Sequence, residues 1–165
     1  TAVHNVSRLT HAHPIALVGC DIFVAVLLSL MDGTQKDAAV LRGMEQVRAY
    51  ADRRPEFKSA FAEYARIGEA DFSLLPESKI ASSGYVVDTL EAALWCFLTT
   101  DSYRSCIIKV LGLGKDTDSI GAVAGAMAGI YYAGSEEQDI PKEWSDALQG
   151  QGQLIQAVQH LAERY

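Results

Sequence analysis

The chain has 165 residues, of which 49% are hydrophobic and 21% charged, a balance that fits one globular domain with a substantial core. Its net charge of −7 argues against nucleic acid and anionic membranes as the main partners, because both are themselves negative. The three cysteines, Cys20, Cys96 and Cys106, lie in apolar stretches and lack metal-type spacing. They predict buried free thiols in a reducing compartment, which indicates the cytoplasm.

The N-terminal part of the chain predicts one long apolar helix. Residues 15–31 form a run that is apolar on nearly every face and is interrupted by the charged Asp21, and Pro14 suits the first turn of a helix. A run of this length is at the lower limit for crossing a bilayer, and it contains a charge, so we expect a buried core helix. Residues 1–13 predict an irregular or short helical segment before it.

The middle of the chain predicts three further helices and a loop. Apolar residues recur at helical spacing over residues 36–51 and 57–64, with Pro55 between the two segments. Residues 68–80 have no periodicity and predict a long loop. A helix is expected over residues 86–99. Its predicted inward face consists of Val87, Leu90, Leu94 and Phe97.

The C-terminal part continues the helical pattern. Asp101 is the predicted N-cap of a helix that Gly112 and Gly114 end. A helix over residues 119–132 follows, then a short helix opening at Pro141 and a final amphipathic one. No stretch alternates apolar and polar residues as a strand does, so the chain is predicted to be all-α, with roughly seven to nine helices in a single domain.

Two aspartates and a serine precede the helix predicted over residues 119–132. Asp116, Asp118 and Ser119 supply oxygen atoms, the ligands that hard cations such as Mg²⁺ take. They predict part of a metal site at a helix N-terminus. The alternative is that an aspartate only caps the helix. A calcium EF-hand is excluded because Ile120 and Met127 would occupy ligand positions. A phosphatase-type D-x-D motif needs a preceding strand, and the preceding pattern is helical.

Glycines recur every four residues along this helix, at Gly121, Gly125 and Gly129. A glycine inside a helix costs about 0.8–1.0 kcal/mol relative to alanine, so three on one face predict the close approach of a neighbouring helix. The alternative is tight packing without function. Such packing is expected to bring the preceding aspartates deep into a helical bundle, where charged carboxylates need partners.

These stretches together resemble the ADP-ribosylglycohydrolase family. Residues 111–133 are similar to its C-terminal metal motif, a Gly-rich turn followed by D-x-D, a hydroxyl residue and a Gly/Ala helix. Residues 9–11 resemble its L-T-H segment, and residues 83–90 its S-G-Y-V-x-D-T-L segment. Residues 140–144 are similar to its late I-P-x-x-W. The matches follow the family's order and cover nearly the whole chain.

The resemblance implies a compact orthogonal all-α bundle with two Mg²⁺ or Mn²⁺ ions in a cleft. The implied reaction is hydrolysis of the glycosidic bond joining ADP-ribose to a protein side chain or a small acceptor. The implied metal ligands are Asp116, Asp118 and Ser119. The implied substrate-binding residues are His11, Ser83, Gly84 and Tyr85. The alternatives are that His11 caps a helix end and that Tyr85 is a half-buried packing residue.

The sequence departs from the family in lacking the other ligands. The family's paired aspartates and its proposed catalytic carboxylate belong to an N-terminal half, and this chain has no Asp-Asp dipeptide. Asp88 and Thr89 are the nearest imitation and are better interpreted as helix scaffold. We therefore expect residues 1–165 to be the C-terminal half of a member, with an N-terminal half as partner and no turnover alone. Lys115 also stands where the family more often has glycine or an acid, and it is expected to weaken metal binding unless it faces solvent.

The sequence leaves two other interpretations open. In the first, the chain is a non-catalytic helical relative that kept the fold and lost the binuclear metal site. In the second, the chain forms a dimer in which two copies complete each other's cleft. The motifs do not distinguish arginine, serine or small-molecule acceptors, nor Mg²⁺ from Mn²⁺.

Overall fold

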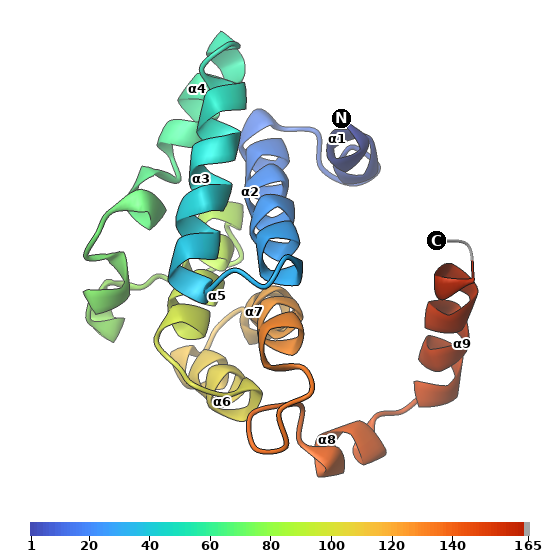
Figure 1. Ribbon diagram of the computed structural model, residues 1–165. Helices are drawn as coiled ribbons and strands as arrows, with labels where there is room; N and C mark the ends of the chain where they lie inside the picture. Colours follow the sequence, from blue (N-terminus) through green and yellow to red (C-terminus); the bar gives the residue numbers. More distant parts are fainter. Residues whose placement is uncertain (164–165) are drawn as a thin grey trace.

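The computed structural model describes residues 1–163, and this part of the chain contains only helices, as predicted (Figure 1). The α-helices are α1 (Ala2–Ser7), α2 (Pro14–Met31), α3 (Lys36–Ala51), α4 (Pro55–Ala62), α5 (Val86–Leu98), α6 (Tyr103–Leu113), α7 (Thr117–Tyr132), α8 (Lys142–Ala147) and α9 (Gln151–Ala162). Three short 3₁₀ helices, η1 (Ala65–Gly68), η2 (Phe72–Leu74) and η3 (Glu77–Lys79), connect α4 to α5.

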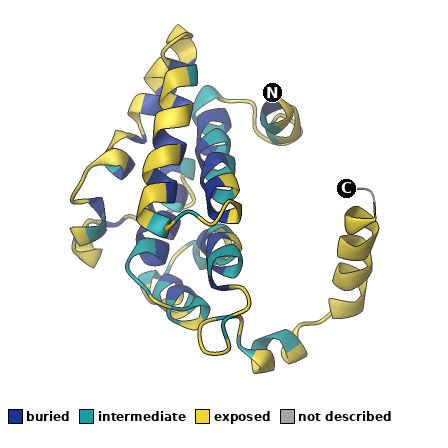
Figure 2. Cartoon of the chain, in the orientation of Figure 1, coloured by how far each residue is buried: buried dark blue, intermediate teal, exposed yellow. Residues whose placement is uncertain are grey.

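Helix α2 is the centre of the fold. It packs against α1, α3, α4, α5 and α7, and Figure 2 shows much of it buried. Within the described residues it is the one helix long and apolar enough to cross a bilayer, but half of its span is buried inside the protein. Val18, Ile22 and Val26 are completely buried. The predicted core helix is therefore confirmed by its packing.

Two glycines let other parts of the chain approach α2 closely. A Cβ added to Gly43 of α3 would lie 2.8 Å from Val26 Cγ2 and 3.1 Å from the Val26 backbone nitrogen. A Cβ added to Gly19 of α2 would lie 2.4 Å from the Tyr64 hydroxyl oxygen. Both positions therefore require a residue without a side chain.

The predicted glycine stripe of α7 packs against α6. A Cβ on Gly125 would lie 3.3 Å from the Tyr103 hydroxyl oxygen, which is tighter than an ordinary contact. At Gly121 and Gly129 the nearest atoms are 3.9 and 3.8 Å away, ordinary van der Waals distances. The stripe does face a neighbouring helix, as predicted, but the closest approaches in the fold are at the glycines on α2 and α3.

Helix α5 has its predicted inward face, and a lysine joins its end to two other helices. Val87, Leu90, Leu94 and Phe97 are all buried. The Lys36 amine donates to the carbonyls of Phe97 and Thr100 and to the Tyr132 hydroxyl, and thereby links α3, the end of α5 and α7. Burial lowers the pKa of Lys36, and nearby negative groups oppose the shift.

Two local predictions are wrong. Residues 68–80 are not a structureless loop: they contain η2 and η3, because Phe72 is buried and the Trp95 indole donates to the Leu75 carbonyl at 3.0 Å. The N-cap of α6 is Ser102 and not Asp101. The Ser102 hydroxyl accepts from the Ser105 amide at 3.1 Å, and Ser105 in turn satisfies the Ser102 amide, forming a capping box.

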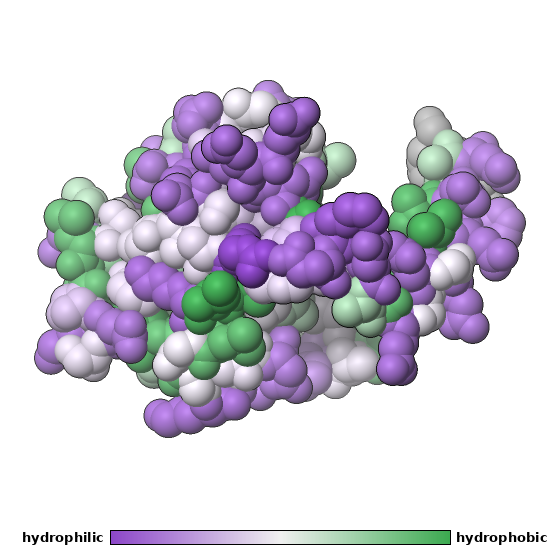
Figure 3. Space-filling view, turned by 90° about the horizontal axis from the view of Figure 1, so that it is seen from below, coloured by the Kyte–Doolittle hydropathy of each residue, from purple (hydrophilic) through white to green (hydrophobic). Residues whose placement is uncertain are grey.

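The last two helices extend from the body of the fold (Figure 1). Helix α8 is attached to α6, because Trp144 packs edge-on against Tyr103 and Glu143 pairs with Arg104. Helix α9 buries none of its side chains. Figure 3 shows hydrophobic side chains on this arm. The exposed apolar residues of α9 are Leu154, Ile155, Val158 and Leu161.

Candidate functional site

The turn between α6 and α7 carries the predicted metal ligands. Helix α6 ends at Gly114, with φ of 71°, and Lys115 follows with φ of 59°. These two left-handed residues reverse the chain, so that Asp116 becomes the N-cap residue of α7. Lys115 is the one non-glycine residue with positive φ in residues 1–163, and it is exposed to solvent.

The carboxylate of Asp116 is not used as a helix cap. It makes no side-chain hydrogen bond to the first turn of α7, although the residue occupies the N-cap position. Asp118 lies in that first turn and Ser119 follows it, and both are exposed. The capping alternative therefore does not describe Asp116, and the structure leaves its oxygen atoms available to a ligand.

The expectation that this cluster lies deep in the bundle is wrong. Asp116 is half-buried, whereas Asp118 and Ser119 are exposed. The glycine face of α7 packs against α6, which directly precedes the turn in the chain. The turn is thus the tip of a helical hairpin, and such connections lie at the surface.

The S-G-Y segment before α5 lies beside this turn. The Asp116 amide donates to the Ser82 carbonyl at 3.2 Å, and the buried Ser82 hydroxyl donates to the Leu113 carbonyl at 3.2 Å. A Cβ added to Gly84 would lie 3.5 Å from Asp116 Oδ2. Two stretches selected separately from the sequence are therefore in contact. The link through Ser82 was not predicted, because a serine in a turn gives no signal of its partner.

Ser83 is used to build the start of α5. Its hydroxyl donates to Asp88 Oδ2 at 2.5 Å and accepts from the Tyr85 amide at 3.1 Å. The Thr89 hydroxyl donates to the Tyr85 carbonyl at 3.2 Å. Asp88 and Thr89 thus support the helix start, as predicted. Gly84 is exposed and Tyr85 is 48% exposed, so these two residues present the free surface of the turn.

His11 is exposed in the connection between α1 and α2. Its backbone amide donates to the Ser7 carbonyl at 2.7 Å, and its carbonyl accepts from the Ser7 hydroxyl at 3.0 Å. The helix cap considered for His11 is provided instead by His13, whose Nδ1 accepts from the Ile15 amide at 3.3 Å. Within residues 1–163, no hydrogen bond joins the His11 side chain to either turn, and its substrate role stays a prediction.

The three oxygen donors suit part of a metal site. Carboxylates and a hydroxyl are the donors that Mg²⁺ and Mn²⁺ accept. In the described part of the chain, no three side chains of the His, Cys, Asp and Glu types come together where they could hold a metal ion. Mg²⁺ requires near-octahedral coordination, so Asp116, Asp118 and Ser119 fit such an ion as an incomplete set. The positive end of α7 opposes a cation, and the two carboxylates offset this effect.

An ion pair between a half-buried arginine and a buried glutamate was not predicted from the sequence. Glu91 of α5 is buried, and Arg66 of η1 donates to its carboxylate and to the Lys79 carbonyl. Burial raises the pKa of Glu91, although Arg66 opposes the shift. The available signal was a glutamate on the apolar face of the helix predicted over residues 86–99.

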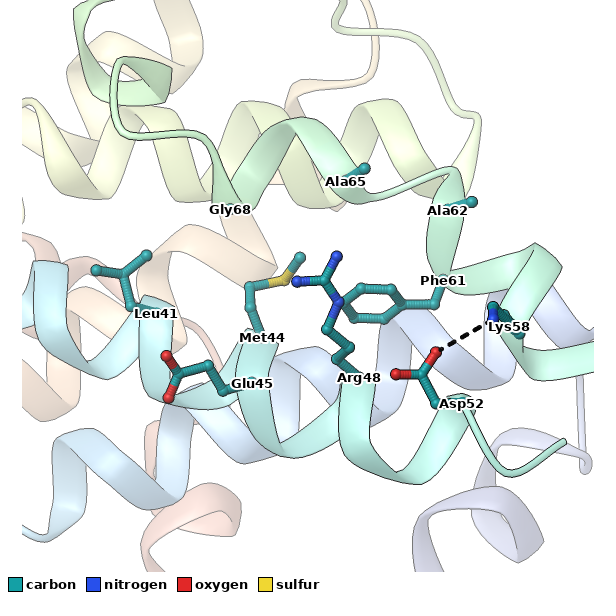
Figure 4. Close-up of a pocket in the computed structure, with 10 residues that line it drawn as sticks. All are labelled: Leu41, Met44, Glu45, Arg48, Asp52, Lys58, Phe61, Ala62, Ala65 and Gly68. Carbon is teal, nitrogen blue, oxygen red and sulfur yellow. Dashed lines mark ion pairs between the residues drawn. The ribbon is translucent and has the colours of Figure 1, made fainter.

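A separate recess lies between α3 and the α4–η1 segment (Figure 4). Its volume is about 270 Å³, and Met44, Arg48 and Phe61 point into it. The Arg48 guanidinium lies 6.0 Å from the centre of the Phe61 ring. None of the predicted site residues lines this recess. The candidate site is therefore located by its oxygen donor atoms and not by this recess.

The fold and the two adjoining turns define an all-α protein that presents oxygen donors beside an S-G-Y backbone. Residues 1–165 match the ADP-ribosylglycohydrolase family along their whole length, and the chain belongs to this family. The expected family is thereby confirmed.

Curated relatives of the chain are named as ADP-ribosyl hydrolases. The chain is 30% identical over 155 residues to the ADP-ribosylarginine hydrolase Tri1 of Serratia proteamaculans, covering 94% of this chain and 38% of that protein. It is 32% identical over 142 residues to the ADP-ribosyl-(dinitrogen reductase) glycohydrolase of Rhodospirillum rubrum, covering 86% and 40%. It is 28% identical to the bovine (Bos taurus) ADP-ribosylhydrolase ARH3, covering 78% and 37%. The chain thus spans about two fifths of the length of these relatives.

Proposed function

We propose that this chain takes part in the metal-dependent hydrolysis of the glycosidic bond that links ADP-ribose to a protein side chain or a small acceptor. The hydrogen bond from the Asp116 amide to the Ser82 carbonyl carries this proposal, because it places an implied metal ligand beside the turn that forms the implied wall of the ADP-ribose pocket. The relatives named as ADP-ribosyl hydrolases support the substrate class.

In this proposal, Asp116, Asp118 and Ser119 hold Mg²⁺ or Mn²⁺. The bound ions would polarise ribose hydroxyls and activate water. Gly84 allows a ligand to approach the backbone, since it has no side chain, and the exposed ring of Tyr85 offers an aromatic face. His11 would lie near the ribose or the phosphates of the bound ADP-ribose. Lys115 is exposed, which lets its ammonium group remain in solvent away from the ions.

The proposed site is incomplete in residues 1–165. Three donors are too few for two ions, so the remaining ligands and the catalytic carboxylate are proposed to come from a partner corresponding to the N-terminal half of the relatives. The three free cysteines support a reducing compartment such as the cytoplasm.

A titration of residues 1–165 with Mn²⁺ by calorimetry tests the metal assignment. We expect binding weaker than micromolar, and Asp118→Asn should weaken it further because it removes a charged oxygen donor. Asp71→Asn is the matched control, since Asp71 is an exposed aspartate outside the two turns, in the segment between η1 and η2. Sub-micromolar binding by residues 1–165 would contradict the incomplete site. Equal binding by both variants would contradict the role of Asp118.

Activity is tested by adding the N-terminal portion of a relative, Mn²⁺ and a protein carrying ADP-ribosylarginine. Release of free ADP-ribose, abolished by Asp118→Ala and retained by Asp71→Asn, supports the enzyme. A mixture that forms a complex but releases no ADP-ribose would favour the non-catalytic relative.

A further inference from the structure

Tyr64 joins the segment after α4 to the first turn of α2. Its side chain is completely buried, and its hydroxyl donates to the Ile15 carbonyl at 2.8 Å. Ile15 also donates its amide to the His13 ring, so the start of α2 is held on both sides. His11 precedes this start by a few residues, and the hydrogen bond of Tyr64 therefore fixes the base of the connection that carries it.

The helix has a notch for the Tyr64 hydroxyl. Gly19 lies one helical turn after Ile15, and any Cβ there would lie 2.4 Å from the hydroxyl oxygen and 3.1 Å from the ring carbon that bears it. Glycine in a helix interior is unfavourable relative to alanine. The cost at Gly19 is accounted for by the space that the hydroxyl occupies.

The segment that carries Tyr64 is also attached to α5. Arg66, two residues further on, pairs with buried Glu91 and donates to the Lys79 carbonyl at 3.2 Å. Burial raises the pKa of Tyr64. The hydroxyl thus stays protonated and remains a donor. Tyr64 stands between the start of α2 and the helix that carries the S-G-Y turn.

We propose that Tyr64 is a positioning residue whose hydrogen bond to Ile15 fixes His11 relative to the turn of Ser83, Gly84 and Tyr85. This inference rests on the proposed function in one respect: the two segments form the wall that binds ADP-ribose. Tyr64 is buried and does not itself touch the ligand.

The first test measures ADP-ribose binding to residues 1–165 by calorimetry, well below the unfolding temperature of every variant. Tyr64→Phe removes only the hydroxyl, and Gly19→Ala displaces it while keeping the tyrosine. Both should weaken binding by up to about tenfold, because part of the binding energy would then be spent on ordering the start of α2 that the hydrogen bond no longer holds. Tyr50→Phe is the control, because the Tyr50 hydroxyl makes no hydrogen bond within residues 1–163. Unchanged affinity in Tyr64→Phe would overturn the proposal.

The second test needs no ligand. The backbone amide signals of His11 and Gly84 in a ¹⁵N–¹H spectrum should both move in Tyr64→Phe and stay in place in Tyr50→Phe. Signals that do not move in Tyr64→Phe would overturn the coupling of the two segments. If they move but unmodified residues 1–165 bind no ADP-ribose, the positioning role is supported and the ADP-ribose pocket of the proposed function fails. Should Gly19→Ala not fold, Tyr64→Phe alone decides both measurements.

Discussion

At the scale of single residues, Lys115 has the least favourable backbone conformation in the site. Its φ of 59° lies in the left-handed region, where a Cβ crowds the following carbonyl oxygen. Gly114 beside it has a similar φ and no such crowding. The turn that presents Asp116 therefore carries backbone strain at Lys115, whereas Gly114 adopts its positive φ without strain.

Lys115→Gly should stabilise the fold by about 1 kcal/mol. The relief of left-handed backbone strain in the folded state is larger than the cost of the extra conformational entropy that glycine gives the unfolded chain. Urea unfolding monitored by circular dichroism measures the change. Lys115→Ala is the control: it removes the charge and keeps the Cβ, so its stability should stay near that of the unmodified chain. An equal gain in both variants would assign the effect to charge and not to strain.

Sequence reasoning identified the residues of the turns but not their depth or their bonds. The chemical types of Asp116 and Asp118 were sufficient to mark them as oxygen donors. The exposure of the two aspartates depended on which helix packs against the glycines of α7. A periodic pattern does not predict which helix that is. The same limit explains Ser102, where a one-residue shift of the cap depended on the Ser105 hydroxyl.

At the scale of helices, two glycines inside α-helices have opposite consequences. Gly43 meets Val26 side-chain and backbone atoms, whereas Gly129 meets only a ring atom of Tyr103 at ordinary distance. Gly43 allows α2 and α3 to pack closely. Gly129 lowers the helix propensity of α7 without permitting a closer contact.

Gly43→Ala should therefore destabilise the protein by about 1–3 kcal/mol, the usual range for overpacking, because α2 and α3 must separate. Gly129→Ala is its matched counterpart and should stabilise by up to about 1 kcal/mol through helix propensity. Thermal unfolding of the two variants beside the unmodified chain gives the comparison. Destabilisation of similar size in both would show that the α6–α7 contact is tighter than its distances indicate.

Helical periodicity, together with the apolar run of α2, was sufficient to place nearly all of the α-helices, because the other packed helices each have one apolar face. It failed over residues 68–80, where the 3₁₀ helices depend on long-range contacts such as the one from Trp95 to Leu75. For α9 it predicted the helix correctly, and the apolar face that produced the pattern is exposed in the described chain. A pattern records that a face is apolar, not what covers it.

At the scale of the whole molecule, the ion pair between buried Glu91 and half-buried Arg66 links stability to pH. Because burial raises the pKa of Glu91 above its usual 4.5, the folded state holds this proton more tightly than the unfolded state does. This residue alone therefore makes stability fall as pH rises from 4.5 through the raised pKa. Other carboxylates act in the opposite direction, so only a comparison of variants isolates the effect.

Glu91→Gln should show this difference. Its free energy of unfolding relative to the unmodified chain should improve as pH rises through that window, because glutamine has no charge to bury. Urea unfolding at a series of pH values measures it. Glu77→Gln, at an exposed glutamate, provides the baseline and should show no such trend. A relative stability that worsens with pH would mean that the attraction of Arg66 exceeds the cost of burial.

The family and the all-α architecture could be predicted from short motifs in a fixed order. The proximity of the Gly84 turn to Asp116 could not, since the two lie in separate motifs and are brought together by the packing of α5 on α7. The hydrogen bond from the Tyr64 hydroxyl to the Ile15 carbonyl was equally hidden, because a tyrosine at helical spacing predicts only a core residue.

The turn before α5 has a thermodynamic consequence for whatever binds there. Ser83, Asp88 and Thr89 hold its backbone from within the chain, and Ser82 ties it to the neighbouring turn. Its conformational entropy is therefore lost when the protein folds and not when a ligand arrives. A ligand at Gly84 and Tyr85 meets an ordered surface, and more of its contact energy appears as affinity.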